Sequence, residues 1–485
     1  MRLILDLHPD HRGFGGGTGE AEIIRASTPV ASWNLPAESA ELDLEAGILI
    51  VEDPDYSYPS DWSALSGDYR IKPMLVVTPT DRENEIRVEG PKVPVSLQPN
   101  AAELVKLDLD EVVREVGSGT ADTGVPGVLE IMRESQLLAG HPEPVGGGGE
   151  DLHRAYVVLP IGYHDLRHDR RVWPVIYLIP GRSDARNVAN TVAKLAVEPA
   201  MKGIVPQAIW VVLATGTPYG HHFFLDSSLH GPRARALVEE FIPWIDIRFR
   251  TIPKPDARLL AGEEQGGFAA LHLLLEHPEV FGDAWATSPE AISLEALGTI
   301  NLRDDVNAYE DADGSSNPAL RTSLGSKREL IHLDVRGEVL RSRALDQPGE
   351  RWSELCAAFG GGPTGNREAW WPFEPDTGRL RPIQVDKWMQ NDLTRKVRMD
   401  PMLARHLNEH ARIMVGDRDE YYRNLGARVL QEAVRTSLGN EGLDVEDPTW
   451  ITEIDASSSI EAGMVATMMR NEEIMAILRD RGHHE

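Results

Sequence analysis

Two hydrophobic patterns divide the chain. Up to about residue 138, short β-rich runs such as "GILIVEDP" and "YRIKPMLVVTP" are separated by Pro, Asp, Ser and Gly. Runs with this punctuation predict an all-β, sandwich-like module. Farther along, continuous apolar runs such as "PVIYLIPG" and "QAIWVVLAT" alternate with amphipathic stretches. This alternation predicts an α/β domain whose mainly parallel sheet is covered by helices on both faces.

A Gly- and Pro-rich stretch, "GHPEPVGGGGED", lies where the pattern changes and is typical of a linker. We therefore predict a β-rich N-terminal domain with its linker over residues 1–145 and an α/β domain over residues 146–485. Two domains are also what a chain of 485 residues favours. Residues from about 290 to 410 lack a strand rhythm and form a predicted insertion. We expect its tryptophans to fill a local core; they are Trp352, Trp370, Trp371 and Trp388.

Composition and net charge exclude some classes of binding partner from our expectations. The chain has 49 Lys and Arg against 77 Asp and Glu, a formal net charge of -28. Such a surface repels phosphates and anionic lipids, so we expect neither a nucleic-acid nor a membrane partner. The single cysteine, Cys356, excludes an internal disulfide. The start, "MRLILDLHPDHRGFGGG", lacks the apolar core of a secretory signal, so a cytoplasmic location is the default expectation.

One short stretch contains a motif that is typical of hydrolase active sites. "LLAGEEQGGFAAL", residues 259–271, reads as a strand that enters a tight glycine turn and then a helix. The turn has the G-x-S-x-G frame of a nucleophile elbow, with Glu264 in place of the serine. Small neighbours are required because the turn presses against the strand and the helix, and Gly262, Gly266 and Gly267 supply them. We expect Glu264 to project from the C-terminal edge of the sheet.

Several segments between residues 151 and 424 carry a family resemblance. They include "PVIYLIPG", "YGHHFFLDSSLHGPRARALVEEFIPWID", "LLAGEEQGGFAAL", "HPEVFGDAWATSP" and "VGDRDEYYRN". In order and spacing they resemble the putative-esterase branch of the α/β-hydrolases, which contains esterase D-like and enterochelin-esterase-like proteins. The resemblance is greatest to members with a β-rich N-terminal domain, and members are often exported. It implies an α/β-hydrolase fold for the C-terminal two-thirds of the chain.

The resemblance also implies positions for a catalytic triad. The family's serine falls on Glu264, and its acid falls on Asp417 or Asp419. Its histidine would lie on the last loop, where Ser457, Ser458 and Ser459 stand instead. A serine is a poor nucleophile without a base, so the loss of two triad members argues against ordinary serine-esterase chemistry.

Backbone groups of the family's oxyanion hole do not depend on side-chain identity. The resemblance places these donors near Gly181 and Arg182 and on the amide of Gln265. One interpretation is therefore structural: the carboxylate of Glu264 accepts these N–H groups itself and fills the hole.

A second interpretation keeps chemistry at Glu264. A carboxylate can act as a nucleophile or general base, and the missing histidine could be replaced by His221, His222 or His230 from "YGHHFFLDSSLHGP". A third interpretation is a metal ion at the same edge of the sheet. Its candidate ligands are Glu263, Glu264, His221, His222, Asp417 and Asp419. The spacing matches no known ligand signature, so neither a metal nor another cofactor is predicted.

The leading functional prediction is a degenerate family member that binds rather than hydrolyses. Its ligand, a small molecule or a protein, would occupy a pocket between the elbow, the loop carrying Asp226 and His230, and the Trp-rich insertion. The alternative is a hydrolase of altered chemistry that uses Glu264 on an ester-like substrate. A purely structural protein with a closed pocket is a further rival. The ligand and the oligomeric state stay open.

Overall fold

A computed structural model describes two compact units. The first comprises Met1–Gly119, Glu143–Gly148 and Leu333–Ser353, and the second Thr120–Pro142, Gly149–His332 and Glu354–Glu485. The described residues are 2–9, 30–34, 56–58, 67–76, 86–98, 111–114, 125, 127–139, 152–165, 170–182, 184–197, 205–217, 219–321, 327–332, 334–336, 338–339, 351–362, 367–441, 451–454 and 459–483.

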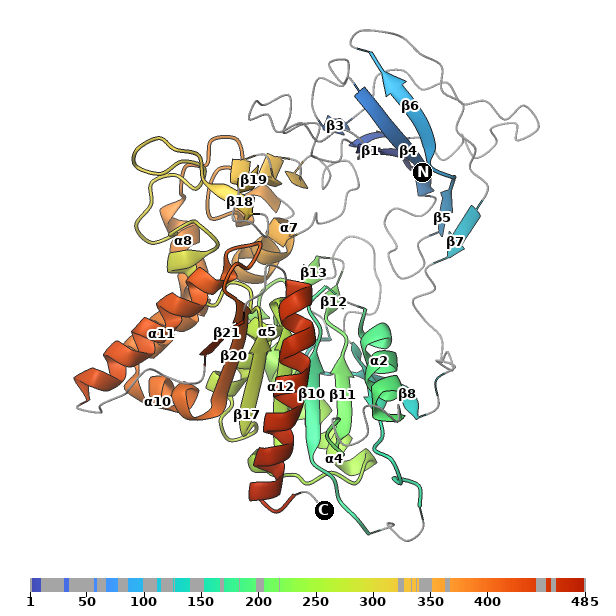
Figure 1. Cartoon of the computed structure of the whole chain (residues 1–485), viewed down its shortest axis with the longest axis vertical. Coiled ribbons are helices and arrows are strands. Elements are labelled where there is room, and N and C mark those ends of the chain that lie inside the picture. The colour runs from blue at the N-terminus through green and yellow to red at the C-terminus, as the bar shows by residue number, and fades with distance from the viewer. Residues whose placement is uncertain are drawn as a thin grey trace. The chain divides into compact units, whose positions relative to one another are not determined.

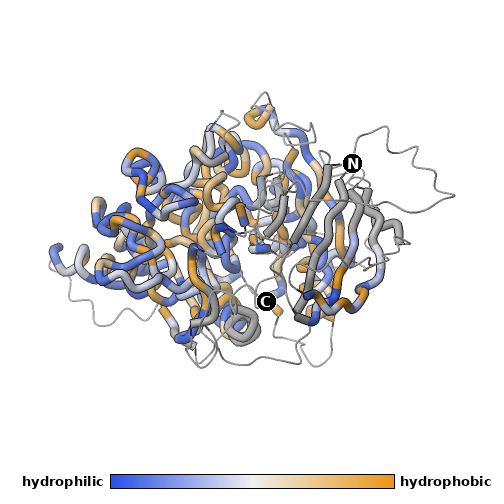
Figure 2. The backbone as a smooth tube through the Cα atoms, turned by 90° about the horizontal axis from the view of Figure 1, so that it is seen from above, coloured by the Kyte–Doolittle hydropathy of each residue, from blue (hydrophilic) through white to orange (hydrophobic). Residues whose placement is uncertain are grey.

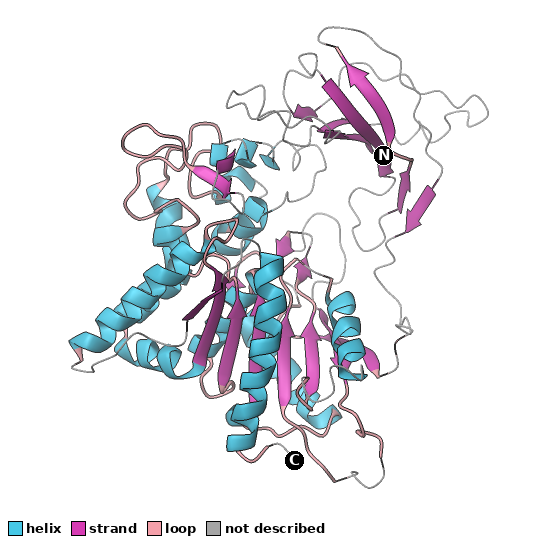
Figure 3. Cartoon of the chain, in the orientation of Figure 1, coloured by secondary structure: helices cyan, strands magenta, loops and turns pink. Residues whose placement is uncertain are grey.

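The first unit contains an antiparallel sheet (Figure 3). Its strand order is β3-β2-β1-β4-β5-β7, and β6 also pairs with β4. On β4, Tyr69 and Ile71 are buried while Asp68 and Arg70 are exposed, the alternation expected of a sheet with one buried face. An all-β N-terminal domain is confirmed; a second, facing sheet stays a prediction. The strands are β1 (Arg2–Pro9), β2 (Val30–Asn34), β3 (Tyr56–Tyr58), β4 (Gly67–Val76), β5 (Ile86–Glu89), β6 (Val93–Leu97) and β7 (Glu111–Arg114).

The second unit is built on an eight-stranded sheet in the order β21-β20-β17-β16-β10-β11-β9-β8 (Figure 1). Six neighbouring strands of this sheet run parallel: β21, β20, β17, β16, β10 and β11. Strand β9 pairs with β11 in the antiparallel direction, and β8 pairs with β9 in the antiparallel direction. This mainly parallel sheet confirms the predicted α/β-hydrolase fold. The strands are β8 (Val128–Glu134), β9 (Leu152–Val158), β10 (Val175–Ile179), β11 (Ile209–Leu213), β16 (Arg258–Glu263), β17 (Asp283–Thr287), β20 (Ala411–Gly416) and β21 (Ile451–Ile454).

Strand β8 belongs to a different unit from the one its sequence pattern indicates. It precedes the Gly-rich stretch at which we placed the domain boundary, so the prediction included it in the N-terminal domain. The structure pairs it with β9 along its whole length, from Val128↔Val158 to Glu134↔Leu152. The Gly-rich stretch therefore lies between two strands of one sheet, and the second unit begins near Thr120.

Helices cover the sheet of the second unit. Helices α2 (Ala185–Val197) and α12 (Ser459–Asp480) share a core with the strands, through side chains such as Ala189 and Ile474. Helix α5 (Gln265–Glu276) packs on β10, β16 and β17. Figure 2 shows hydrophobic and hydrophilic segments alternating along the tube of this unit, as strands and amphipathic helices require. Within the described ranges, every helix is too short or too polar to pass through a lipid bilayer.

Shorter elements connect these layers. Before α5 lie the two-residue strands β12 (Gly216–Thr217), β13 (Gly220–His221), β14 (Asp226–Ser227) and β15 (Gly231–Pro232), and the helical segments α3 (Arg233–Ala236), η6 (Leu237–Phe241), α4 (Ile242–Arg248) and η7 (Pro255–Ala257). After β17 lie η8 (Leu294–Ala296), β18 (Pro318–Arg321), β19 (Lys327–Leu330), α7 (Arg351–Leu355), η9 (Cys356–Gly360), η10 (Arg367–Trp370), α8 (Pro382–Trp388), η11 (Met389–Asn391), α9 (Leu393–Met399), α10 (Pro401–His410) and α11 (Arg423–Asn440).

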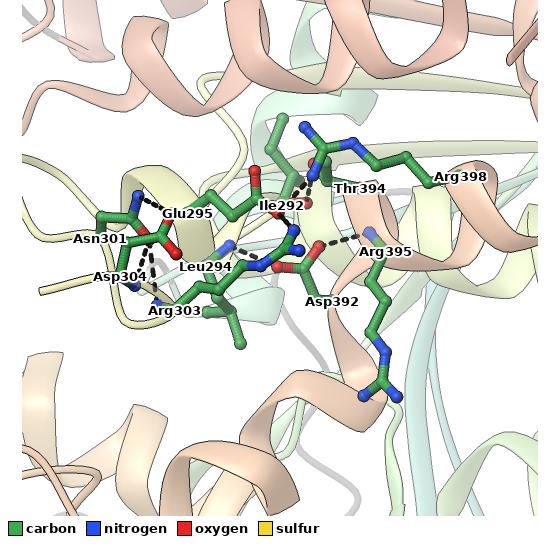
Figure 4. Close-up of polar contacts among 10 residues, drawn as sticks. All are labelled: Ile292, Leu294, Glu295, Asn301, Arg303, Asp304, Asp392, Thr394, Arg395 and Arg398. Carbon is green, nitrogen blue, oxygen red and sulfur yellow. Dashed lines mark hydrogen bonds and ion pairs between the residues drawn. The ribbon is translucent and has the colours of Figure 1, made fainter. Parts of the chain in front are cut away.

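The segment from 290 to 410 has its own aromatic core and a polar anchor. Trp370, Trp371 and Trp388 are all buried, as expected of a local core. Asp392, fully buried, ties the two ends of the segment together: its carboxylate accepts the amide of Leu294 and caps α9 through the amide of Arg395 (Figure 4). Specific contacts therefore join residues near 294 to residues near 392 in the second unit, whereas Leu333–Ser353 of the segment belongs to the first unit.

Candidate functional site

The chain makes a tight turn between β16 and α5, with Glu264 at its centre. Glu264 has φ 51° and ψ −113°, a left-handed conformation that costs a non-glycine residue free energy. Its N–H donates to the carbonyl of Thr287 at 2.9 Å, and its carbonyl accepts from the amide of Glu290 at 2.9 Å. Backbone bonds to the end of β17 thus hold the strained residue at the edge of the sheet.

Close backbone contacts explain the glycines around this turn. A Cβ on Gly262 would lie 2.0 Å from the carbonyl oxygen of Gly266, and one on Gly266 would lie 1.9 Å from that of Ile179. A Cβ on Gly181 would meet the Glu264 Cβ at 3.0 Å. Gly267 approaches Pro289 less closely, at 3.1 Å. The elbow and the segment after β10 therefore lie against each other with no room for side chains.

The carboxylate of Glu264 faces an arginine. Its Oε1 lies 3.5 Å from Nη2 of Arg423, the first residue of α11. The Glu264 side chain is 22% exposed and that of Arg423 only 5%. Among the described residues, the polar partner of this carboxylate is Arg423 and not the amides of Arg182 or Gln265. The structure therefore does not show the self-filled oxyanion hole that the first interpretation predicts.

Arg423 joins three carboxylates in a buried network. Its Nε donates to Oε2 of Glu290 at 3.0 Å, and its Nη1 lies 3.8 Å from Oδ2 of Asp419. Both acids are almost completely buried. Burial opposes the charge of Arg423, but Glu290, Asp419 and Glu264 outweigh it and raise the pKa of the guanidinium above its usual value. The arginine is permanently charged, and the network holds one cation against three anions.

The two candidate acids have different environments. Oδ1 of Asp419 accepts the amides of Tyr421 and Arg423 at 3.0 and 3.1 Å, so this side chain shapes the turn before α11. The Asp417 side chain is 40% exposed and lies beside Arg418. Arg321 donates to the main-chain carbonyls of both aspartates, which fixes the loop. Asp419 is therefore the acid that the structure places next to Arg423.

The adjacent histidines are committed to the backbone. Nδ1 of His221 accepts the amide of Phe223 at 2.9 Å, so Nε2 carries the proton and donates to the carbonyl of Pro180 at 3.1 Å. Nδ1 of His222 accepts the amide of Phe224 at 3.1 Å. Burial lowers the pKa of His221 to about 3, and burial together with nearby Arg233 lowers that of His222 well below its usual value.

His230 and Asp226 lie on the same loop. Nδ1 of His230 is 3.4 Å from the Thr217 hydroxyl, and its Nε2 is buried without a hydrogen-bond partner among the described residues. Burial lowers the pKa of His230 to about 3. Oδ1 of Asp226 accepts the amide of Ala234 at 2.7 Å at the start of α3. Asp226 thus caps a helical segment.

A glutamate from α7 borders the elbow from the other side. Oε2 of Glu354 accepts from the Gln265 side-chain amide at 3.3 Å and lies 3.6 Å from Nη2 of Arg182. It also packs over Gly220, where a Cβ would meet its Cγ at 2.1 Å. Gln265 and Arg182, predicted near the oxyanion hole, are thus brought together by Glu354.

The remaining predicted residues divide into described and undescribed ones. Burial raises the pKa of Glu263, while buried Arg470 of α12 acts in the opposite direction. Ser457 and Ser458 lie outside the described residues, and of Ser459 only the backbone, at the start of α12, is described. No three His, Cys, Asp or Glu side chains of the described ranges are grouped so as to hold a metal ion.

A family model described as "Putative esterase" matches residues 150–439. The chain belongs to the putative esterase family. Two curated relatives from strains of Mycobacterium tuberculosis, Esterase MT1326 and Esterase Rv1288, are each 31% identical to it over 146 residues. That match covers 30% of this chain and 30% of each relative's length.

Solved structures of esterases and related hydrolases also align with the chain. A ferulic acid esterase is 14% identical, with 72% of this chain and 97% of that chain covered and a TM-score of 0.43. FphF, a fluorophosphonate-binding serine hydrolase of Staphylococcus aureus, is 13% identical, with 72% and 98% covered and a TM-score of 0.37.

Sequence reasoning missed Arg423 in this member of the family, and Glu354 as well. Arg423 stands inside the motif "VGDRDEYYRN", four residues after Asp419. The signal that could have found it is charge balance, because a glutamate at a half-buried elbow needs a cation. Glu354 lies about 90 residues from the elbow in sequence, and its position gives no comparable signal.

Proposed function

We propose that this member of the putative esterase family binds a ligand at its elbow and has lost the serine-esterase mechanism. The observation that supports this most directly is the position of Arg423, between Glu264 and Asp419. In a hydrolase triad an imidazole lies between the nucleophile and the acid and takes the proton. A guanidinium has no acceptor and does not lose its proton, so it cannot act as the base.

The environment of the carboxylate also argues against a nucleophilic Glu264. An ester formed on a carboxylate must later be hydrolysed by water that a base activates. Of the candidate bases, His221 is bonded to the carbonyl of Pro180, beside the elbow. It uses both ring nitrogens for backbone hydrogen bonds. The hydrolase of altered chemistry is the second candidate function, favoured by the partial exposure of Glu264.

The binding half of the proposal rests on the polar groups that reach solvent at the elbow. The side chains of Glu264, Glu354 and Arg182 are 22%, 17% and 40% exposed, and they come from three different segments. A convergent set of a few polar groups is typical of a small-molecule site.

Turnover of 4-nitrophenyl acetate tests the catalytic half. We expect wild-type protein and Glu264→Gln to give the same rate, indistinguishable from that of the matched control Glu279→Gln, whose side chain is 66% exposed on the loop after α5. Turnover that Glu264→Gln abolishes and the control retains would contradict the proposal and favour the altered hydrolase.

Saturation-transfer NMR with the same ester tests the binding half. We expect a signal with wild-type protein that weakens in the charge-reversed variant Glu264→Lys and persists in Glu279→Lys. An absent signal for the wild type, together with absent turnover, would favour the purely structural protein.

A further inference from the structure

The turn from His221 to Phe224 has an unusual backbone. Phe223 and Phe224 both have left-handed conformations, with φ values of 55° and 51°. Bulky residues avoid this region because Cβ approaches the neighbouring carbonyl, so two in succession persist only when their surroundings hold them. Both phenylalanines are buried. The turn is therefore a strained segment fixed by its contacts.

Two imidazoles supply those contacts. Nδ1 of His221 accepts the amide of Phe223, and Nδ1 of His222 accepts the amide of Phe224, at 2.9 and 3.1 Å. A protonated imidazole donates at both nitrogens and accepts at neither. Each bond therefore exists only while its histidine is neutral, and protonation would remove the acceptor that holds a strained residue.

The surroundings disfavour an added proton. The rings of His221 and His222 are 5.8 Å apart, and His230 lies 6.4 Å from His222. Arg182 faces His221, while Arg233 and His153 face His222. The acids at the rim pair with other groups: Glu240 lies 3.9 Å from His153, and Glu354 lies by Arg182. A positive charge inside the turn would therefore be buried and would be repelled by Arg182 and Arg233.

The turn is connected to the elbow. His221 donates to Pro180, which precedes the glycine that packs on the Glu264 Cβ. Phe223 packs edge-on against Phe268 of α5 and against Phe359, with ring centroids 5.7 and 5.6 Å apart. If the turn opens, the segment 180–182 loses a hydrogen bond and α5 loses an aromatic neighbour.

We propose that the His221–Phe224 turn is an acid-sensitive latch on the elbow. It is closed while His221 and His222 are neutral, and uptake of protons opens it and releases the 180–182 segment beside Glu264. The latch does not depend on whether the elbow binds or hydrolyses its ligand.

The direction of the pH dependence follows from the two states. In the closed turn the pKa of His221 is about 3, whereas an exposed imidazole titrates near its ordinary value of 6.5. The open state thus binds more protons, so opening grows as pH falls from about 6.5 toward about 3. Each proton taken up multiplies the opening constant by up to about tenfold per pH unit, and two protons by up to about a hundredfold.

Hydrogen exchange read by mass spectrometry tests the latch on the full-length protein. After correction for the intrinsic rate, we expect the opening constant of peptides covering residues 219–231 to rise between pH 6 and pH 5 by about eightfold if one histidine takes up a proton and by about sixtyfold if both do. Peptides from α5 (265–276) report global unfolding and should remain protected. A rise that is equal in both peptides, or no rise in the turn, would overturn the proposal.

Substitutions assign the protons. Asparagine offers Oδ1 where histidine offers Nδ1 and does not titrate, so His222→Asn should keep the turn closed and reduce the rise by about tenfold. The surface control His164→Asn should leave it unchanged. An undiminished rise in His222→Asn would overturn the assignment. If this variant fails to fold, the pH at which opening of the wild-type turn begins distinguishes histidines from carboxylates. Opening caused by histidines begins below about pH 6.5, whereas opening caused by carboxylates would begin only below about pH 5.

Discussion

The elbow network and the histidine turn are neighbours that handle buried ionisable groups in opposite ways. At the elbow, Arg423 stays charged because three carboxylates lie within 3.0–3.8 Å of its guanidinium and raise its pKa. In the turn, burial lowers the pKa values of His221 and His222, Arg182 and Arg233 act in the same direction, and each Nδ1 accepts a backbone amide. Burial is common to both regions, so the partners decide which protonation state survives.

The largest expected effect comes from removing the shared cation. Arg423→Met removes the cation shared by the buried acids Glu290 and Asp419, so we expect a loss of about 5 kcal/mol in the free energy of unfolding. Urea denaturation at pH 7.5 measures it. The control Arg435→Met, on the exposed face of the same helix, should cost less than about 1 kcal/mol. Similar losses of unfolding free energy in the two variants would show that Arg423 contributes no more to stability than an exposed arginine does.

Acidification should lower the free energy of unfolding through the buried histidines in and around the turn. The pKa values of His153, His221 and His230 in the folded protein are about 4, 3 and 3, below the ordinary 6.5, so the unfolded chain binds more protons between these limits. Stability is then complete above pH 6.5 and falls as pH decreases. At pH 5.5 each histidine costs about 1.4 kcal/mol, about 4 kcal/mol together. Urea denaturation at pH 7.5 and 5.5 checks the sign; equal stability at both would contradict neutral histidines.

A smaller contrast sharpens the description of the elbow. Glu290 is buried and its Oε2 accepts a 3.0 Å hydrogen bond from Nε of Arg423, so Glu290→Gln should cost about 2–3 kcal/mol. Glu264 is partly exposed and only 3.5 Å away, so Glu264→Gln should change stability by less than about 1 kcal/mol. Thermal and urea unfolding of both variants would test the order; a larger cost for Glu264→Gln would reverse it.

The sequence predicted local features well and long-range ones poorly. The elbow frame follows from five consecutive residues, 262–266, and the buried strands follow from continuous apolar runs. The partner of Glu264 does not, because Arg423 is 159 residues away and only the fold brings it near. The acid at the site was left open between Asp417 and Asp419, since only side-chain direction separates them. The predicted boundary at the Gly-rich stretch separated β8 from β9, because the composition of a linker does not show which strands pair across it.

The central claim is that a guanidinium occupies the place of the catalytic base. The variant Glu264→Ser restores a hydroxyl at the strained elbow without changing Arg423 or Asp419. Labelling of this variant by a fluorophosphonate, read by intact-protein mass spectrometry, tests the claim most directly. We predict no labelling above the wild-type level, because Arg423, which cannot accept the serine proton, lies where the imidazole base of a triad would be. Stoichiometric labelling of the restored serine would show that a base is present and would contradict the account.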